Sequence, residues 1–462
     1  MFWQSRSGGD DDRIFLIDSG ERYTYADVFR KGDLLFSDAD RSVVMILCDR
    51  SCAFVAAYLG ALRRGLVPML VDGAATAQAV ASNIATYRPR YIFAPETAEL
   101  AGYVLHKRAG PKALFLREAQ DAAPLHEGLA LLMPTSGSTG DPKCVRLTAR
   151  NLESCTRSIT EYLQMSAQRV CVSLLPFHYS YGLSVLHNTI FCRASMVLTE
   201  KTILDKTLWS MIEDEKVTDL AGVPFTFETM RRLRLSEACM DNLVCVTQAG
   251  GRLSPELTRH FHEYFHAHGV EYFSMYGQTE AAPRISYVPP ARAMEKLGSV
   301  GIPISCGRVV IAETGEAAGE GELVYIGSNV SMGYAFGADD LGRGDEFQGV
   351  LRTGDQASID TEGFITIVGR KKRFIKLQGV SVNLDHAEAV LKSRTLDCMV
   401  IGVENRLLVC VTEPDVERAR ISVAEMFNFH PSSVKVVACE ALPFTAAGKP
   451  DYPALSARFL ST

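Results

Sequence analysis

Residues 129–143 read LALLMPTSGSTGDPK, and they carry both a structural and a chemical signal. The apolar run Leu129–Met133 predicts a buried β-strand that leads directly into a loop of Ser, Thr and Gly. Two glycines let the backbone approach an anion closely, while hydroxyls, backbone N–H groups and Lys143 supply donors and positive charge. A flexible surface loop is the plainer alternative, but the lysine and the preceding strand favour a phosphate-binding loop. Its predicted members are Thr135, Ser136, Gly137, Ser138, Thr139, Gly140 and Lys143.

The chain before this loop alternates strand and helix signals. Val43–Leu47 and Leu66–Val71 are continuous apolar runs, and Cys52–Leu62 between them has the length and spacing of a helix. Continuous apolar strands indicate a parallel sheet that helices cover on both faces. The alternation continues with a helix at 78–86 and with strands at 91–94, 170–175, 218–223 and 243–247. The sequence therefore predicts a large multi-sheet α/β body spanning residues 1–369.

The pattern changes near residue 369. Strands at 357–359 and 364–368 flank a turn at Gly363, and a run of cations follows from Arg370 to Lys376. The elements predicted beyond them are a helix at 384–392, a hairpin turning at 404–405, a helix around Val423 and a strand at 434–437. About ninety residues suffice for a small α+β domain, which we place at residues 370–462.

Composition and charge exclude several classes of protein. The chain has 462 residues, of which 47% are hydrophobic and 22% charged, as in ordinary soluble globular proteins. A net charge of −6 argues against a nucleic-acid-binding protein. The apolar stretch Phe54–Leu62 is too short to cross a bilayer, and the acidic start of the chain is unlike a signal peptide, so we expect a cytoplasmic protein without a membrane partner. The 12 cysteines are scattered singly, which predicts reduced core residues rather than disulfides or a metal site.

Motifs along nearly the whole chain resemble the adenylate-forming superfamily, which comprises acyl- and aryl-CoA synthetases, amino-acid adenylation domains and firefly-type luciferases. The loop at 135–143 is similar to the phosphate loop of that family, and it differs from the loop of kinases and ATPases because Lys143 does not follow the second glycine directly. The other matching motifs, in order, are 22–25 (RYTY), Gly250-Gly251, 276–280 (YGQTE), 321–323 (GEL), 352–355 (RTGD), Gly363-Phe364, Gly369-Arg370, Lys376 with Gly379, and 443–449 (PFTAAGK). The resemblance implies a large body and a small C-terminal domain that is mobile.

The resemblance also implies an ATP site with Mg²⁺. Residues 135–143 would hold the β- and γ-phosphates, Thr279 would bond the α-phosphate, and Glu280 would hold Mg²⁺, a hard cation that suits carboxylate and phosphate oxygens. Asp355 would accept hydrogen bonds from both ribose hydroxyls, and Arg370 would donate to ribose or phosphate. The residues expected around the adenine and beside it are Gly250, Gly251, Tyr276 and Gly277.

The C-terminal domain would supply the catalytic lysine. Lys449 lies in a Pro- and Gly-containing loop near the end of the chain, from which its ammonium could reach both the substrate carboxylate and the α-phosphate. Lys372 occupies the position of the family's hinge, and Gly379 would line the tunnel for the thiol. Arg373 and Ser381 depart from the residues common in the family, which leaves the identity of the thiol acceptor open.

The acid pocket is expected near residues 176–183, PFHYSYGL. His178 stands where amino-acid-activating members carry an aspartate that pairs with the α-ammonium, so an α-amino acid is disfavoured as substrate. Aromatic and apolar neighbours favour an aryl or fatty acid instead. The predicted lining comprises Phe177, His178, Phe225, Gln248, Ala249 and Met275.

The sequence therefore predicts an ATP-dependent ligase that forms an acyl-AMP and pyrophosphate from a small carboxylic acid and then passes the acyl group to a thiol. The expected cofactors are ATP and Mg²⁺, and the expected acceptor is CoA or the phosphopantetheine of a carrier protein. The alternatives are an amino-acid-activating enzyme, a luciferase-like oxygenase that uses the acyl-AMP, a non-enzymatic adenylate-binding regulator, and a generic kinase or ATPase.

Overall fold

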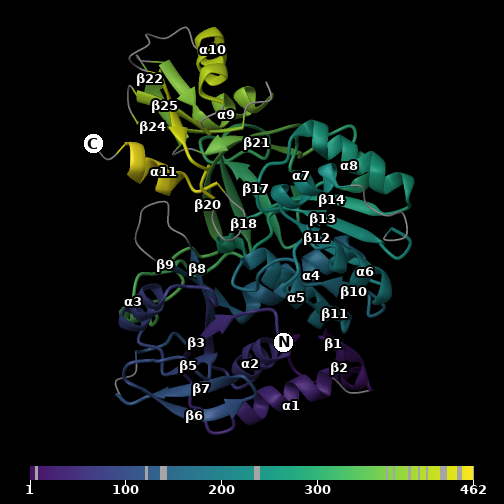
Figure 1. Cartoon of the computed structure of the whole chain (residues 1–462), viewed down its shortest axis with the longest axis vertical. Coiled ribbons are helices and arrows are strands. Elements are labelled where there is room, and N and C mark those ends of the chain that lie inside the picture. Colours follow the sequence, from purple (N-terminus) through teal and green to yellow (C-terminus); the bar gives the residue numbers. More distant parts are fainter. Residues whose placement is uncertain are drawn as a thin grey trace. The chain divides into compact units, whose positions relative to one another are not determined.

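The chain forms two compact units (Figure 1). The computed structural model describes residues 1–5, 9–119, 123–135, 143–233, 240–370, 373–377, 380–393, 397–403, 406–412, 415–426, 434–444 and 450–460. The first unit holds most residues up to Arg308 together with Ile326–Leu351, and the second holds Val309–Tyr325 and the residues from Arg352 onward. The predicted division after residue 369 and the mobility of residues 370–462 stay predictions.

An eight-stranded sheet carries the predicted phosphate loop. Its strands lie in the order β19 (Tyr334–Ala335), β9 (Lys143–Thr148), β8 (Leu129–Thr135), β4 (Val67–Asp72), β3 (Val43–Cys48), β5 (Tyr91–Pro95), β7 (Lys112–Arg117) and β6 (Tyr103–Ala109). The central strands β8, β4, β3 and β5 are parallel, as predicted, and all carry continuous buried runs. The strands toward both edges are antiparallel. The predicted parallel sheet is therefore confirmed at its centre, and the structure adds antiparallel strands at the edges, where tight antiparallel pairs need no crossover helix.

A nine-stranded sheet forms the other half of the first unit. Its order is β16 (Ile302–Pro303), β15 (Ser286–Tyr287), β14 (Glu271–Tyr276), β13 (Cys245–Gln248), β12 (Asp219–Gly222), β10 (Val170–Val172), β11 (Ser195–Leu198), β1 (Ile14–Asp18) and β2 (Glu21–Thr24). The strands from β14 to β1 are parallel, so their carboxyl ends meet at one edge. In open α/β sheets this edge is where ligands bind.

Three buried clusters hold the first unit together. The largest contains residues of both sheets and of the helices α1 (Tyr25–Leu35), α2 (Cys52–Arg63), α4 (Ala149–Tyr162) and α5 (Ser180–Cys192), which therefore pack between the sheets. A second cluster packs α6 (Lys206–Asp214), α7 (Pro224–Arg232) and α8 (Pro255–Ala267) on the nine-stranded sheet, and a third packs α3 (Ala77–Tyr87) on the eight-stranded sheet. Helices thus cover the sheets as the sequence predicted for the α/β class.

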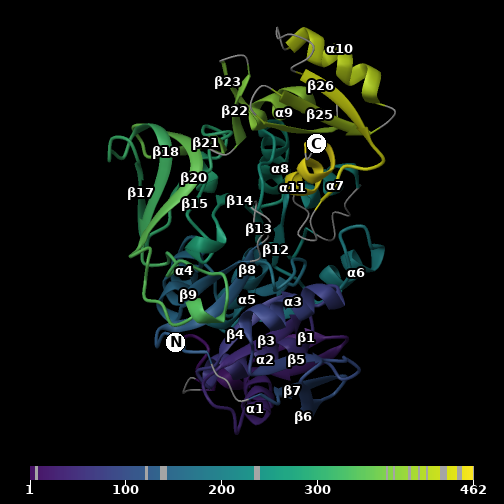
Figure 2. The ribbon, with the colours of Figure 1, turned by 90° about the vertical axis from the view of Figure 1, so that its left-hand side faces the viewer.

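The second unit is built mainly from antiparallel strands (Figure 2). One sheet contains β17 (Gly307–Ile311), β18 (Gly319–Gly327), β20 (Val350–Ile359) and β21 (Ile365–Arg370). The remaining elements are the hairpin of β22 (Phe374–Leu377) and β23 (Val380–Asn383), the sheet of β24 (Cys398–Val403), β25 (Arg406–Thr412) and β26 (Val434–Cys439), and the helices α9 (Leu384–Ser393), α10 (Val416–Met426) and α11 (Tyr452–Phe459). β24 and β25 pair antiparallel up to Val403 and Arg406, which confirms the predicted hairpin.

Every cysteine in the described ranges is free, and most are buried. In the same ranges, no helix is long and apolar enough to cross a membrane. No group of three or more His, Cys, Asp or Glu side chains there could hold a metal ion by itself.

Candidate active site

The predicted phosphate loop connects two paired strands. Thr135 ends β8, Lys143 begins β9, and the two residues are cross-strand partners. Ser136, Gly137, Ser138, Thr139 and Gly140 lie outside the described residues. The ammonium of Lys143 lies 3.5 Å from the centre of the Tyr334 ring, so the aromatic face attracts its charge.

Tyr334 joins the predicted phosphate-binding lysine to the predicted metal-binding carboxylate. Its hydroxyl donates to Glu280 Oε1 at 2.7 Å. Burial, followed by the charge of Glu280, raises the pKa of Tyr334, so the phenol remains protonated and remains a donor. Sequence reasoning missed Tyr334 because its strand, β19, is two residues long and comes near β9 only in the fold.

Glu280 and Thr279 lie in a single 3-10 turn, η3 (Thr279–Ala281), which follows β14. Thr279 Oγ1 lies 3.0 Å from Ser180 Oγ at the start of α5, and the Glu280 carbonyl accepts from the Ser331 N–H at 2.8 Å. Gly277 permits this turn because a Cβ there would lie 1.8 Å from the Pro283 carbonyl oxygen. The turn therefore presents a hydroxyl and a carboxylate from a fixed backbone.

The predicted adenine-binding residues follow β13 and end β14. Gly250 has a φ of +87°, and a Cβ at this position would lie 2.4 Å from the Tyr179 hydroxyl. Gln248 donates to the Gly251 carbonyl at 2.9 Å, which fixes the glycine pair against the strand. Tyr276 stands on the neighbouring parallel strand, since β13 pairs with β14 up to Ser274. Their contact with adenine stays a prediction.

The six residues of the predicted acid pocket differ in burial. Phe177 is fully buried and stacks on Phe54 with ring centres 5.3 Å apart, whereas Phe225 is 52% exposed on α7. Gln248 and Ala249 are buried at the end of β13. Met275 lines an internal cavity beside the nine-stranded sheet. Whether all six contact the acid stays a prediction.

His178 has a carboxylate neighbour that the sequence did not indicate. Its Nδ1 lies 3.8 Å from Asp72 Oδ1 at the end of β4. Burial lowers the pKa of His178 more than Asp72 raises it, so the imidazole is neutral near neutral pH. Asp72 comes from a strand far away in the sequence, and no local pattern pairs it with the segment 176–183.

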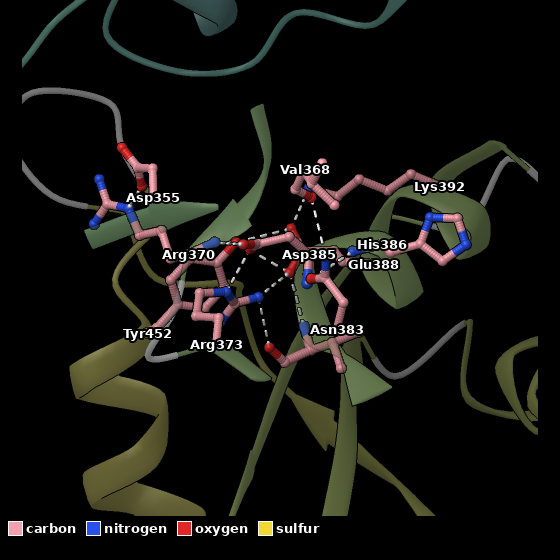
Figure 3. A network of polar contacts seen from close by, with 11 residues as sticks. Asp355, Val368, Arg370, Arg373, Asn383, Asp385, His386, Glu388, Lys392 and Tyr452 are labelled. Carbon is pink, nitrogen blue, oxygen red and sulfur yellow. Dashed lines mark hydrogen bonds and ion pairs between the residues drawn. The ribbon is translucent and has the colours of Figure 1, made fainter. Parts of the chain in front are cut away.

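The second unit carries the pair predicted to bind ribose. Asp355 on β20 and Arg370 on β21 are cross-strand partners, and Arg370 Nε lies 3.5 Å from Asp355 Oδ1 (Figure 3). Asp355 is buried while Arg370 is exposed. The pair offers a carboxylate acceptor beside an exposed cationic donor, which is the chemistry that a ribose with its phosphate needs.

Figure 3 also shows the polar contacts of Arg373, a residue that departs from the family pattern. Its guanidinium pairs with Asp385 and lies 3.4 Å from Glu388, and it stacks 3.7 Å from the Tyr452 ring. The Tyr452 hydroxyl and Lys392 also bond Glu388, at 3.0 and 2.9 Å. The network ties the segment after the predicted hinge to α9 and α11. Lys372, Gly379 and Lys449 lie outside the described residues.

The chain is similar to known proteins in sequence and in structure. The family model "AMP-binding enzyme" matches residues 3–335. A 2-succinylbenzoate–CoA ligase of Staphylococcus epidermidis is 27% identical over 335 residues, covering 70% of this chain and 68% of that protein. Among solved structures, O-succinylbenzoate coenzyme A synthetase of Bacillus subtilis with ATP and magnesium has a TM-score of 0.75 at 21% identity and 95% coverage of both chains. ATP-bound MatB of Rhodopseudomonas palustris has a TM-score of 0.76 at 20% identity, covering 98% of this chain and 97% of that one.

Proposed function

Because the chain belongs to the family of AMP-binding enzymes, we propose that it activates a carboxylic acid with ATP, forms the acyl-AMP and passes the acyl group to coenzyme A. Membership confirms the family and the enzyme class that the sequence predicted. ATP and Mg²⁺ as cofactors are supported by the solved neighbour that binds both. Since the named relatives are CoA ligases, CoA is favoured over a carrier-protein phosphopantetheine as the acceptor.

The observation that carries the proposal is the connected set of Lys143, Tyr334, Glu280, Thr279 and Ser180. It combines a cation, a carboxylate and hydroxyls, which is the donor set that a nucleoside triphosphate with a divalent cation requires. Mg²⁺ is usually held by one or two carboxylates together with phosphate oxygens, so a single Glu280 fits it. When bound, Mg²⁺ would neutralise charge on the phosphate oxygens.

In this reaction the substrate carboxylate attacks the negatively charged α-phosphate of ATP. The protein must therefore position both groups and neutralise part of their negative charge. We assign Lys143 and the loop 135–143 to the departing β- and γ-phosphates and Thr279 to the α-phosphate. Lys449 would stabilise the charge that develops as the carboxylate oxygen bonds to the α-phosphorus and pyrophosphate leaves. The thiol then attacks the acyl carbon and AMP leaves, with no covalent bond to the protein.

The C-terminal residues complete the proposal. Asp355 and Arg370 would hold the ribose, Gly250, Gly251, Tyr276 and Gly277 would surround the adenine, and Lys372 would act as the hinge of a mobile domain covering residues 370–462. Gly379 would then line the route of the thiol. An aryl acid is the favoured substrate, because the named relatives act on an aryl acid and the predicted pocket is largely apolar.

The test is product identity across a panel of aryl, fatty and amino acids, with pairs that differ only by an α-amino group. The proposal predicts AMP and pyrophosphate in equal amounts, an acyl hydroxamate when hydroxylamine replaces CoA, and an acyl-CoA when CoA is present. Release of ADP, or light emission without a thioester, would contradict it. Better use of the amino acid in each pair would overturn the reading of His178, while the ligase mechanism would stand.

A further inference from the structure

A buried arginine and a buried asparagine of the first unit each have a side-chain atom without a hydrogen-bond partner among the described residues. Arg284 is 2% exposed and Asn188 is 5% exposed. Within the described part of the chain, Arg284 Nε and Asn188 Oδ1 have no hydrogen-bond partner, and no carboxylate forms an ion pair with Arg284. A buried guanidinium without a counter-ion is strongly unfavourable, because burial removes its hydration. An anion that binds beside Arg284 would supply the missing counter-charge.

Both side chains line the same cavity, which has a volume of about 30 Å³. That space corresponds to roughly two water-sized positions, enough for the two oxygens of a carboxylate. Leu163, Leu220 and Met275 are among the apolar residues that line it. A mainly apolar cavity with a few convergent polar groups is typical of a small-molecule site.

The groups around Arg284 cannot neutralise its charge. Its guanidinium lies 5.1 Å from the centre of the Tyr181 ring, and the Tyr181 hydroxyl is held by Thr247 Oγ1 at 2.7 Å. Burial raises the pKa of Tyr181, so the phenol stays neutral. Arg284 is fixed through its backbone, since its N–H donates to the Ala281 carbonyl at 3.1 Å. The cavity therefore keeps a net positive charge at this end.

One acid also lines the cavity, but its charge is already paired. Asp219 lies 3.2 Å from Arg169 and pairs in register with Cys245. Thr247, whose hydroxyl bonds the Tyr181 hydroxyl, lies two residues beyond Cys245 on β13, which is about 7 Å along the strand. The carboxylate and Arg284 thus belong to different ends of the cavity.

One face of α5 leads from the predicted reaction centre into this cavity. Ser180, Ser184 and Asn188 are spaced by four residues and so lie along one face. Ser180 contacts Thr279, whereas Ser184 and Asn188 line the cavity. Each four-residue step rises about 6 Å, so the cavity lies about 6–12 Å from the Thr279 end of the helix.

We propose that Arg284 lies at the inner end of the acid pocket and binds a second anionic group, a carboxylate, at the far end of the substrate. The inference rests on the proposed function, and it makes the substrate a dicarboxylic acid whose carboxylates lie about 6–12 Å apart. Arg284 then sets specificity and takes no part in the reaction itself.

The test compares dicarboxylic aryl acids, 2-succinylbenzoate among them, with the monocarboxylic acids that lack the second carboxylate. Wild-type protein should prefer the diacids in kcat/KM on the order of 10²-fold, the scale for an unpaired partner of a buried charge pair. Arg284→Met, which removes the charge and keeps an apolar chain, should abolish that preference. An unchanged preference in Arg284→Met, or a wild-type preference for monoacids, would overturn the proposal.

Thermal unfolding with and without the acids measures binding at the anion site independently of catalysis. Diacids should raise the unfolding temperature of the wild-type protein more than the monoacids do, and Arg284→Met should lose this difference. Arg284→Met without ligand should unfold at the same temperature or higher, because an unpaired buried charge is removed. A large drop with unchanged acid preference would assign Arg284 a purely structural role. Failure of every acid to release pyrophosphate would contradict the proposed function, whereas the thermal shifts would still test the anion site.

Discussion

Replacing Tyr334 by phenylalanine removes one hydroxyl between Glu280 and Lys143 and keeps the ring. The lost hydrogen bond spans 2.7 Å and has a carboxylate acceptor. Bonds to charged groups contribute about 1.5–3 kcal/mol, which corresponds to roughly 10- to 100-fold in a rate or binding constant. We expect Tyr334→Phe to lower kcat/KM for ATP by that factor, to raise the Mg²⁺ concentration needed for activity, and to leave the ranking of acids unchanged. Steady-state kinetics with varied ATP and Mg²⁺ measure all three quantities.

Tyr87→Phe is a matched control for this variant. The Tyr87 hydroxyl donates to the Ala335 carbonyl at 2.9 Å, one residue from Tyr334 on the same strand, and its acceptor is not a carboxylate. Both substitutions leave an acceptor without its donor and should lower the unfolding temperature. Only Tyr334→Phe should change the kinetics with ATP. Equal ATP kinetics in the two variants would refute the argument that Tyr334 acts through Glu280.

Three further predictions concern stability and catalysis. Burial lowers the pKa of His187 from 6.5 to about 3, so the unfolded chain binds a proton that the folded chain does not, and stability should fall by about 1.4 kcal/mol per pH unit below about pH 6.5. Denaturant unfolding at several pH values measures this slope, which His187→Gln should reduce. Glu388→Ala removes the shared acceptor of a buried network and should lower the free energy of unfolding by about 3–5 kcal/mol, whereas Glu417→Ala at an exposed pair should change it by less than about 1 kcal/mol; equal values would contradict the role of the network. Lys449→Ala should slow adenylation about 10²- to 10³-fold and spare thioester formation from preformed acyl-AMP, and equal loss in both half-reactions would exclude the assigned role.

The elements predicted well are those whose local pattern has one explanation. β3, α2 and β4 follow from two continuous apolar runs around a helical segment, and the strand before the phosphate loop follows from the same kind of run. β6 was missed because it lies at a sheet edge, where its side chains are largely exposed or half-buried and the apolar signal weakens.

The residues of the candidate site also fall into two groups, those that a local motif indicates and those that only the fold brings together. Thr279 and Glu280 could be named as candidates from the sequence because they stand in one short motif next to Gly277. Tyr334 and Arg284 could not, because their significance depends on partners that only the fold brings near, a carboxylate in one case and a cavity in the other. No periodicity or spacing in a single sequence records such contacts.

The most direct measurement of the central claim follows an oxygen atom. An acid whose carboxylate carries a heavy oxygen isotope is converted with ATP and CoA, and the phosphate-containing products are separated and weighed by mass spectrometry. If the carboxylate attacks the α-phosphorus and the thiol later displaces AMP, one labelled oxygen must appear in AMP and none in pyrophosphate. Label in inorganic phosphate, with ADP as the nucleotide product, would show attack on the γ-phosphorus and would contradict the acyl-adenylate account.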